Sequence, residues 1–252
     1  MNQNEINDFW SEDAGVYDTI IQEELKSFRP AAWQKQILSH FPEGKVLRIL
    51  DIGCGPAFFS IILSEKGHDV TGVDGADGML KQARKNVENC KSTATIMKMD
   101  ANYLDFPDET FDLIVSRNVT HTILNHVTAY KEWKRVLKKG GILLIYDANW
   151  HWEETRPDIK KQFVEDWRSC IRTFGSDYNG NTDPDGPAPV DECIQNHPLG
   201  DLVRPDYDCG ILKALDFTDV QIQRDITQKL WDEKERLLYK STPMFEISAI
   251  KA

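Results

Sequence analysis

Short apolar segments alternate with segments of helical periodicity through most of the chain, and this alternation restricts its fold more than any other feature. Strand-like segments lie at residues 46–52, 69–74, 95–99, 111–116, 142–146, 220–224 and 244–250. Helix-like segments lie at residues 56–66, 78–87, 129–137 and 207–215. Several strands are apolar throughout, as expected when both faces of a sheet are covered. We therefore predict an α/β fold with a doubly wound, mostly parallel seven-stranded sheet.

The alternation breaks once, between residues 150 and 206. This block contains a helix-like aromatic stretch with Phe163, Trp167 and Phe174, followed by a segment rich in Gly, Asp, Asn and Pro at residues 175–189. Irregular segments of this length are usually functional or disordered. We predict an N-terminal helical cap at 1–45, a cofactor-binding core at 46–150, a substrate lid inserted after strand 5 at 151–206, and completion of the core sheet at 207–252.

Composition narrows the range of partners. The 252 residues are 40% hydrophobic, enough for a packed core, and the formal net charge of −11 disfavours binding to nucleic acid. Residues 1–10 have no apolar signal-peptide core, and no stretch approaches the roughly 20 apolar residues of a membrane helix. Five cysteines, an odd number, indicate reduced thiols. We expect a cytoplasmic protein with no nucleic-acid or membrane partner, and the oligomeric state stays open.

Polar and small residues follow the predicted strands where each one ends. The first strand leads into Asp51–Gly55, the next two end in Asp74 and Asp100, and the fourth precedes Arg117 and Asn118. Open parallel sheets bind ligands at this edge, and glycines let the backbone approach a ligand closely. Asp74 lies 19 residues beyond Gly55, the spacing of a carboxylate that accepts from ribose hydroxyls. Each feature alone also fits a structural turn, but together they predict a nucleoside site.

A nicotinamide or flavin dinucleotide fits this turn poorly. The dinucleotide fingerprint needs a third glycine where this chain has Phe58, and Phe59 adds to the crowding. An acidic site suits a ligand that lacks phosphate and carries a sulfonium and an ammonium group. The pattern therefore disfavours dinucleotides.

The strand-end segments resemble the motifs of class I (Rossmann-like) S-adenosylmethionine-dependent methyltransferases. The five matching segments are Leu50-Asp-Ile-Gly-Cys-Gly55, Val70-Thr-Gly-Val-Asp74, Met97-Lys-Met-Asp100-Ala101, Phe111-Asp-Leu-Ile-Val-Ser116 and Val136-Leu-Lys-Lys-Gly-Gly-Ile-Leu-Leu-Ile145. The resemblance covers roughly residues 46–149 and implies S-adenosyl-L-methionine as the cofactor. One departure is Ala57, where the family often has a third glycine.

The resemblance also implies roles for individual residues. Gly53 and Gly55 would pass beneath the methionine part of the cofactor, Asp74 would hold the ribose, Met79 would pack on the adenine, and Asp100 would accept from its exocyclic amine. The full set of expected cofactor-binding residues is Tyr17, Asp51, Gly53, Cys54, Gly55, Asp74, Gly75, Met79, Asp100, Ala101, Arg117 and Asn118.

The expected reaction is methyl transfer to the N, O or S atom of a small-molecule acceptor. His121 and His151 follow the fourth and fifth strands and are the candidate catalytic residues, although each also fits a structural histidine. Two other functions stay open: methylation of a macromolecule (RNA or protein), and cofactor binding without methyl transfer.

Two segments have some features of metal sites. Residues 181–192 nearly match a calcium loop but begin with Asn and contain three prolines. Cys193, His197 and Cys209 match no zinc spacing. We expect no bound metal, and we interpret Cys54 as a structural thiol.

Overall fold

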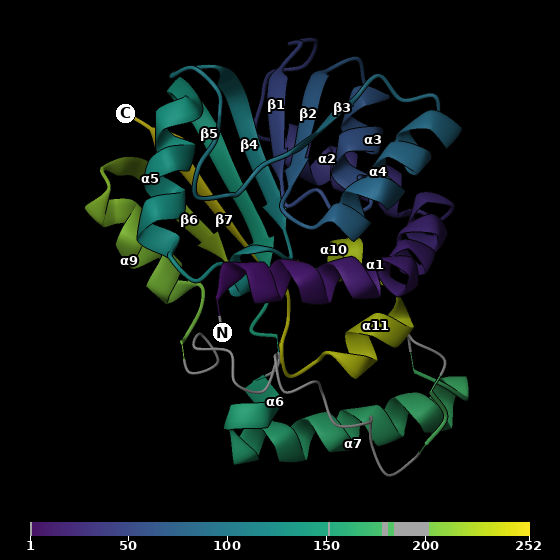
Figure 1. Ribbon diagram of the computed structural model, residues 1–252. Helices are drawn as coiled ribbons and strands as arrows, with labels where there is room; N and C mark the ends of the chain where they lie inside the picture. Colours follow the sequence, from purple (N-terminus) through teal and green to yellow (C-terminus); the bar gives the residue numbers. More distant parts are fainter. Residues whose placement is uncertain (1, 151, 178–180, 184–201) are drawn as a thin grey trace.

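A twisted seven-stranded sheet runs through the centre of the computed structural model, which describes residues 2–150, 152–177, 181–183 and 202–252 (Figure 1). The strands are β1 (Arg48–Ile52), β2 (Asp69–Asp74), β3 (Thr95–Lys98), β4 (Phe111–Arg117), β5 (Leu137–Asp147), β6 (Phe217–Gln223) and β7 (Phe245–Lys251). Their spatial order is β3-β2-β1-β4-β5-β7-β6. Only β7 is antiparallel to its neighbours. The predicted α/β class and mostly parallel seven-stranded sheet are confirmed.

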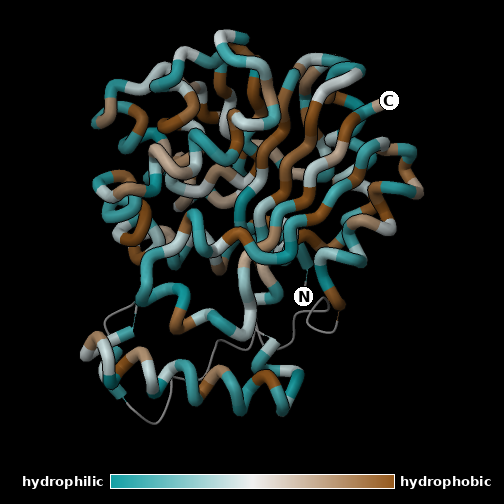
Figure 2. Tube along the Cα trace, turned by 180° about the vertical axis from the view of Figure 1, so that it is seen from behind, coloured by the Kyte–Doolittle hydropathy of each residue, from teal (hydrophilic) through white to brown (hydrophobic). Residues whose placement is uncertain are grey.

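Helices cover both faces of this sheet. In chain order they are α1 (Gln3–Leu25), α2 (Arg29–Leu38), α3 (Phe58–Ser64), α4 (Asp77–Asn89), α5 (His126–Val136), α6 (Trp152–Thr155), α7 (Pro157–Phe174), α9 (Asp206–Ala214), α10 (Thr227–Leu230) and α11 (Glu233–Leu238). Helices α5 and α9 pack on one face, and α2, α3 and α10 pack on the other. Apolar residues follow the central strands in Figure 2, as the sequence pattern predicts for a sheet buried on both faces.

The fifth strand is longer than the sequence predicts. We expected a helix up to Leu137 and a strand from 142, but Leu137 already pairs with Phe111 at the start of β5. A register shift between Phe111 and Leu113 accommodates the extra residues, and Gly140 adopts a φ of +71° within this stretch. A glycine at positive φ lets the strand bend and continue where the sequence suggests a turn.

Helix α1 crosses the sheet at the carboxyl ends of the parallel strands (Figure 1). It packs on α4 at Gly78, where an added Cβ atom would lie only 2.1 Å from the Ser11 carbonyl oxygen. The Gly78 amide donates to the Ser11 hydroxyl at 3.3 Å. The N-terminal helix is thus seated on the sheet edge by a contact that only glycine permits.

The described part of the block between residues 151 and 206 lies at this same end of the molecule. Its helices α6 and α7 are drawn beyond α11 in Figure 1. Phe163, Trp167 and Cys170 of α7 form a buried cluster with Leu238 of α11. The described part of the block therefore packs on α11 and not against the opposite edge of the sheet.

Substituting Gly78 tests how α1 is seated. We expect Gly78→Ala to lower the free energy of unfolding by about 1–3 kcal/mol, because the new methyl group overpacks against the Ser11 backbone. Gly15→Ala is the matched control, since it lies in α1 itself with nothing within 4 Å of an added Cβ. The control should gain about 0.5–1 kcal/mol from helix propensity. Urea denaturation measures both, and a Gly78→Ala protein as stable as wild type would contradict this packing.

Candidate functional site

A cavity of about 490 Å³ lies between α1 and the carboxyl ends of β1, β2 and β4. All twelve residues expected at the cofactor lie on its wall: Tyr17, Asp51, Gly53, Cys54, Gly55, Asp74, Gly75, Met79, Asp100, Ala101, Arg117 and Asn118. His121 also lines the cavity, whereas His151 lies outside the described residues. The fold thus gathers residues that are more than 100 positions apart in the sequence into one site.

The turn between β1 and α3 forms the floor of this cavity. Gly53 and Gly55 have φ angles of +66° and +51°, in the left-handed region that favours glycine. An added Cβ on Gly53 would lie 2.2 Å from a Val119 methyl carbon, so the turn approaches the segment after β4 very closely. Ala57 has a φ of +75°, a backbone conformation that glycine adopts with less strain than alanine. Its side chain is fully buried against Ile61 and Ala83.

Asp74 at the end of β2 is held by backbone amides. Its two carboxylate oxygens accept from the amides of Gly55 and Ala76, both at 2.9 Å. Burial raises the pKa of this carboxyl group. Met79 packs beside it in a cluster with Ala14 and Ala76, which Trp10 and Tyr17 of α1 complete. This side of the cavity therefore offers one fixed carboxylate next to an apolar wall.

Asp51 and Asp100 differ in exposure. Asp51 is buried and accepts from the Ser60 hydroxyl at 2.7 Å, and burial raises its pKa to about 6. Asp100 is exposed at the rim, where Oδ1 accepts from both the amide and the side-chain nitrogen of Asn102.

Arg117 and Asn118 bring the end of β4 to the cavity. The Arg117 guanidinium lies 4.6 Å from the ring centre of Phe58 and 5.2 Å from that of Phe59, and it pairs with Glu24 of α1 at 2.9 Å. Asn118 accepts from the indole nitrogen of Trp150 at 3.3 Å. The charge of Arg117 is therefore balanced within the protein.

Two cavity residues, Glu235 and Tyr239, were not found from the sequence. They lie on and just after α11, a six-residue helix too short to show clear periodicity. The Tyr239 ring lies 5.3 Å from that of Trp150, and Glu235 pairs with Arg29. Burial raises the pKa of Glu235 to about 7, and the attraction of Arg29 offsets this effect only in part, while Glu24 adds a smaller repulsion.

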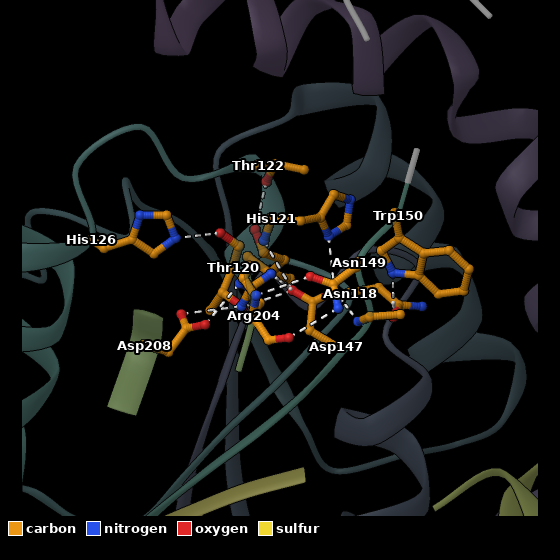
Figure 3. A network of polar contacts seen from close by, with 12 residues as sticks. Asn118, Thr120, His121, Thr122, His126, Asp147, Asn149, Trp150, Arg204 and Asp208 are labelled. Carbon is orange, nitrogen blue, oxygen red and sulfur yellow. Dashed lines mark hydrogen bonds and ion pairs between the residues drawn. The ribbon is translucent and has the colours of Figure 1, made fainter. Parts of the chain in front are cut away.

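His121 stands at the end of a polar network that Figure 3 shows in close-up. It lies in the short 3₁₀ helix η1 (Thr120–Thr122), and its Nδ1 is 3.0 Å from Oδ1 of Asp147 at the end of β5. Asp147 is fully buried. Burial alone would raise its pKa, but His121 and Arg204 hold the pKa of this carboxyl group well below its usual range. An ionised carboxylate only accepts, so this contact places the proton of the neutral ring on Nδ1 and the lone pair on Nε2.

The candidate metal-binding segments fall largely outside the described residues, including Cys193, His197 and most of 181–192. Asn181 is described, and its amide donates to Asp177 at 2.6 Å. Within the part of the chain that the structure describes, no group of three or more His, Cys, Asp or Glu side chains could hold a metal ion. Cys54 is buried, which raises the pKa of its thiol well above the usual value. Among the same residues, no helix is both long and apolar enough to cross a membrane.

Comparison with known proteins matches this arrangement to one family. Residues 50–145 match the family model described as a methyltransferase domain. Demethylmenaquinone methyltransferase from Listeria welshimeri is 30% identical over 148 residues, 57% of this chain and 61% of the relative. This chain thus aligns with about three-fifths of the curated relative's length.

Two solved structures share the fold. A Methanococcus maripaludis protein assigned to the S-adenosylmethionine-dependent methyltransferases superposes with a TM-score of 0.62 at 21% identity, covering 98% of this chain and 94% of that one. Phosphoethanolamine N-methyltransferase 2 from Haemonchus contortus, in complex with S-adenosyl-L-methionine, gives 0.57 at 19% identity, covering 85% and 51%. Residues 50–145 therefore match a methyltransferase domain, and the two solved structures share the fold of this chain.

The raised pKa of Glu235 predicts a pH-dependent stability. Between the ordinary carboxyl pKa of 4.5 and about 7, the folded state binds more protons than the unfolded state, so stability falls as pH rises through this window. From pH 5 to pH 8 this single group removes about 2–3 kcal/mol. We expect Glu235→Gln to lack that loss while keeping an acceptor for Arg29. Urea denaturation of both proteins at the two pH values checks this, and parallel pH dependences would show that Glu235 ionises normally.

Proposed function

We propose that this chain transfers the methyl group of S-adenosylmethionine to a nucleophilic atom of a small-molecule acceptor. The observation that carries the proposal is the cavity at the carboxyl ends of β1, β2 and β4, which gathers all twelve residues expected at the cofactor. The 30% identical relatives named demethylmenaquinone methyltransferases support a small acceptor. Residues of α1 line one side of the cavity and restrict access to it, which disfavours a macromolecular acceptor, as does the net charge of −11.

The chemistry of the wall fits this cofactor. S-adenosylmethionine carries a sulfonium and an ammonium group and supplies the reactive methyl group when bound. The cavity offers three carboxylates at the strand ends, Asp51, Asp74 and Asp100. Among the described lining residues there is no lysine, and Arg117 is paired with Glu24. Such a wall suits a cationic ligand without phosphate and disfavours a dinucleotide.

We assign the parts of the cofactor to parts of this wall. Asp74 would accept from the ribose hydroxyls, with Met79 against the adenine and Asp100 at its amine. The Gly53–Gly55 backbone would pass beneath the methionine part, where Gly55 has no side chain to intrude and the nearest atoms to an added Cβ are 3.7 Å and 4.0 Å away. Asp51, Cys54, Gly75, Ala101, Arg117 and Asn118 would complete the surround, with Tyr17 of α1 above.

The acceptor would bind between His121 and the aromatic residues Trp150 and Tyr239. Methyl transfer from a sulfonium is an in-line displacement, so alignment and exclusion of water supply most of the catalysis. His121 would remove a proton from the acceptor through Nε2 while Asp147 holds its ring. The aromatic walls and Glu235 suit a small acceptor that is partly apolar or cationic.

The inserted block would influence the acceptor site indirectly, through its packing on α11. None of its described residues lines the cavity, whereas Glu235 and Tyr239 do. Because α7 packs on α11 through Trp167 and Leu238, the block can fix the position of these two residues. Its role as a substrate lid is part of this proposal.

Asp74→Ala tests the cofactor assignment. We expect the affinity for S-adenosylmethionine to fall by about 1.5–3 kcal/mol, roughly 10- to 150-fold in Kd, through loss of hydrogen bonds to a charged group. Asp77→Ala is the matched control, because Asp77 is three residues away and its side chain is exposed and pairs with Lys98. Calorimetric titration measures both, after thermal unfolding has shown that the variants fold. Equal affinities in the two folded variants would refute the ribose role.

His121→Ala tests the acceptor assignment. A positioned base contributes about 10²- to 10⁴-fold, so turnover should fall by that factor while the Kd for S-adenosylmethionine stays nearly constant. His151→Ala is the comparison, and we expect it to keep wild-type turnover. Normal turnover in the His121 variant would leave His121 a structural residue, and a selective loss in the His151 variant would transfer the role to that position.

A further inference from the structure

Arg204 lies near the carboxyl-terminal end of the inserted block, and its side chain is buried close to His121, the candidate base. The guanidinium contacts Asp208 of α9 through Nε at 2.8 Å and through Nη2 at 3.2 Å. Nη1 donates to Oδ2 of Asp147 at 3.0 Å, and Nη2 also donates to the Thr120 hydroxyl. Figure 3 shows Arg204 between the two carboxylates, with His121 on the other side of Asp147. Only 3% of the Arg204 side chain is exposed.

The network around Arg204 contains more carboxylates than permanent cations. Asp147 and Asp208 are both fully buried, and Arg204 is the arginine that bridges them. The other polar groups in contact are uncharged donors: the Thr120 hydroxyl donates to Asp147 at 2.7 Å, the Tyr130 hydroxyl donates to Asp208, and Nε2 of His126 lies 2.7 Å from the Thr120 carbonyl oxygen. Tyr17 of α1, which lines the cavity, lies close enough to Asp147 for this carboxylate to add slightly to the rise in the pKa of the phenol that burial causes. Arg204 also acts on the second histidine of the network, since burial lowers the pKa of His126 and Arg204 helps to lower it further. His121 contacts a carboxylate directly, whereas Nε2 of His126 faces a backbone carbonyl oxygen, so His121 is the nearer group to acquire a positive charge if Arg204 were removed.

We propose that Arg204 is a positioning residue that keeps His121 uncharged, and so able to act as a base, by supplying the counter-charge of Asp147. This inference rests on the base role proposed for His121. Without the guanidinium, two buried carboxylates would face the imidazole ring, and a proton on that ring would be their nearest compensation. With the guanidinium present, Asp147 orients the ring without needing its charge.

The backbone of the inserted block fixes where this guanidinium lies. The Asn149 side chain, just after β5, accepts from the Arg204 amide at 3.1 Å and donates to the Arg204 carbonyl oxygen at 2.9 Å. The Trp152 indole nitrogen also donates to the Leu202 carbonyl oxygen at 3.3 Å. The two ends of the block are thus fastened together beside Asp147. The Arg204 side chain therefore links the way the inserted block is attached to the protonation of His121.

The pH dependence of turnover distinguishes this role from a purely structural one. We expect Arg204→Met to move the acidic limb of the kcat–pH profile upward by about one pH unit, because His121 then keeps its proton to higher pH. Asp147→Asn should move the limb downward, because it removes the carboxylate that favours the charged ring. Arg204→Lys should return the limb close to wild type. Arg224→Met is the control, since Arg224 also pairs with an aspartate, Asp206, but is exposed.

A measurement without turnover separates this inference from the proposed function. The ¹H and ¹⁵N resonances of the His121 ring can be followed by NMR during a pH titration of the free enzyme. The pH at the midpoint of this titration should rise in Arg204→Met and fall in Asp147→Asn. If Arg204→Met does not fold, Arg204→Met/Asp208→Asn removes the guanidinium together with one of the two carboxylates that it bridges. His121 should still keep its proton to higher pH in this double variant, because Asp147 has lost its counter-charge. Unchanged His121 titration in a folded variant without Arg204 would overturn the inference. Normal turnover of His121→Ala would instead refute the base role, whatever the titration shows.

Discussion

The close approach of Gly53 to Val119 is the contact on which the geometry of the site depends. It joins the turn after β1 to the segment after β4, at the place where the sheet changes direction of winding. On one side of this contact lie Asp74 and Met79, and on the other lie Asn118 and His121. A side chain at position 53 would separate the two strand ends. The same left-handed turn therefore shapes the floor of the proposed cofactor site and sets the position of the candidate base.

Buried carboxylates in and behind this cavity differ in pKa because the charges and hydrogen-bond donors around them differ. Asp147 contacts Arg204 and has a lowered pKa, whereas Asp51 accepts from Ser60 and has its pKa raised to about 6. Glu235, beside Glu24, has its pKa raised to about 7. Burial raises the pKa of each, and only a close cation with several donors reverses the sign. The network of Figure 3 is thus the place where a permanent negative charge is held next to a histidine.

Most of the fold was predictable because the sheet is buried on both faces. Such strands are apolar throughout, and Asp69–Asp74 was predicted residue for residue. The strand-end carboxylates were predictable for the same reason, since parallel strands end at one edge. The predicted start of β5 was wrong because Gly140 bends the strand without ending it. Glu235 and Arg204 were missed because neither lies on a long periodic element, and tertiary packing alone brings them to the site.

Transfer of an isotope-labelled methyl group from S-adenosylmethionine into a metabolite extract tests the central claim most directly. The account predicts that the wild-type chain moves the label into the low-molecular-mass fraction, in a product that mass spectrometry can identify as heavier than its precursor by one methyl group. Label that stays on the cofactor would contradict methyl transfer to a metabolite. Label recovered in RNA or protein, when those are offered together with the extract, would contradict the small acceptor.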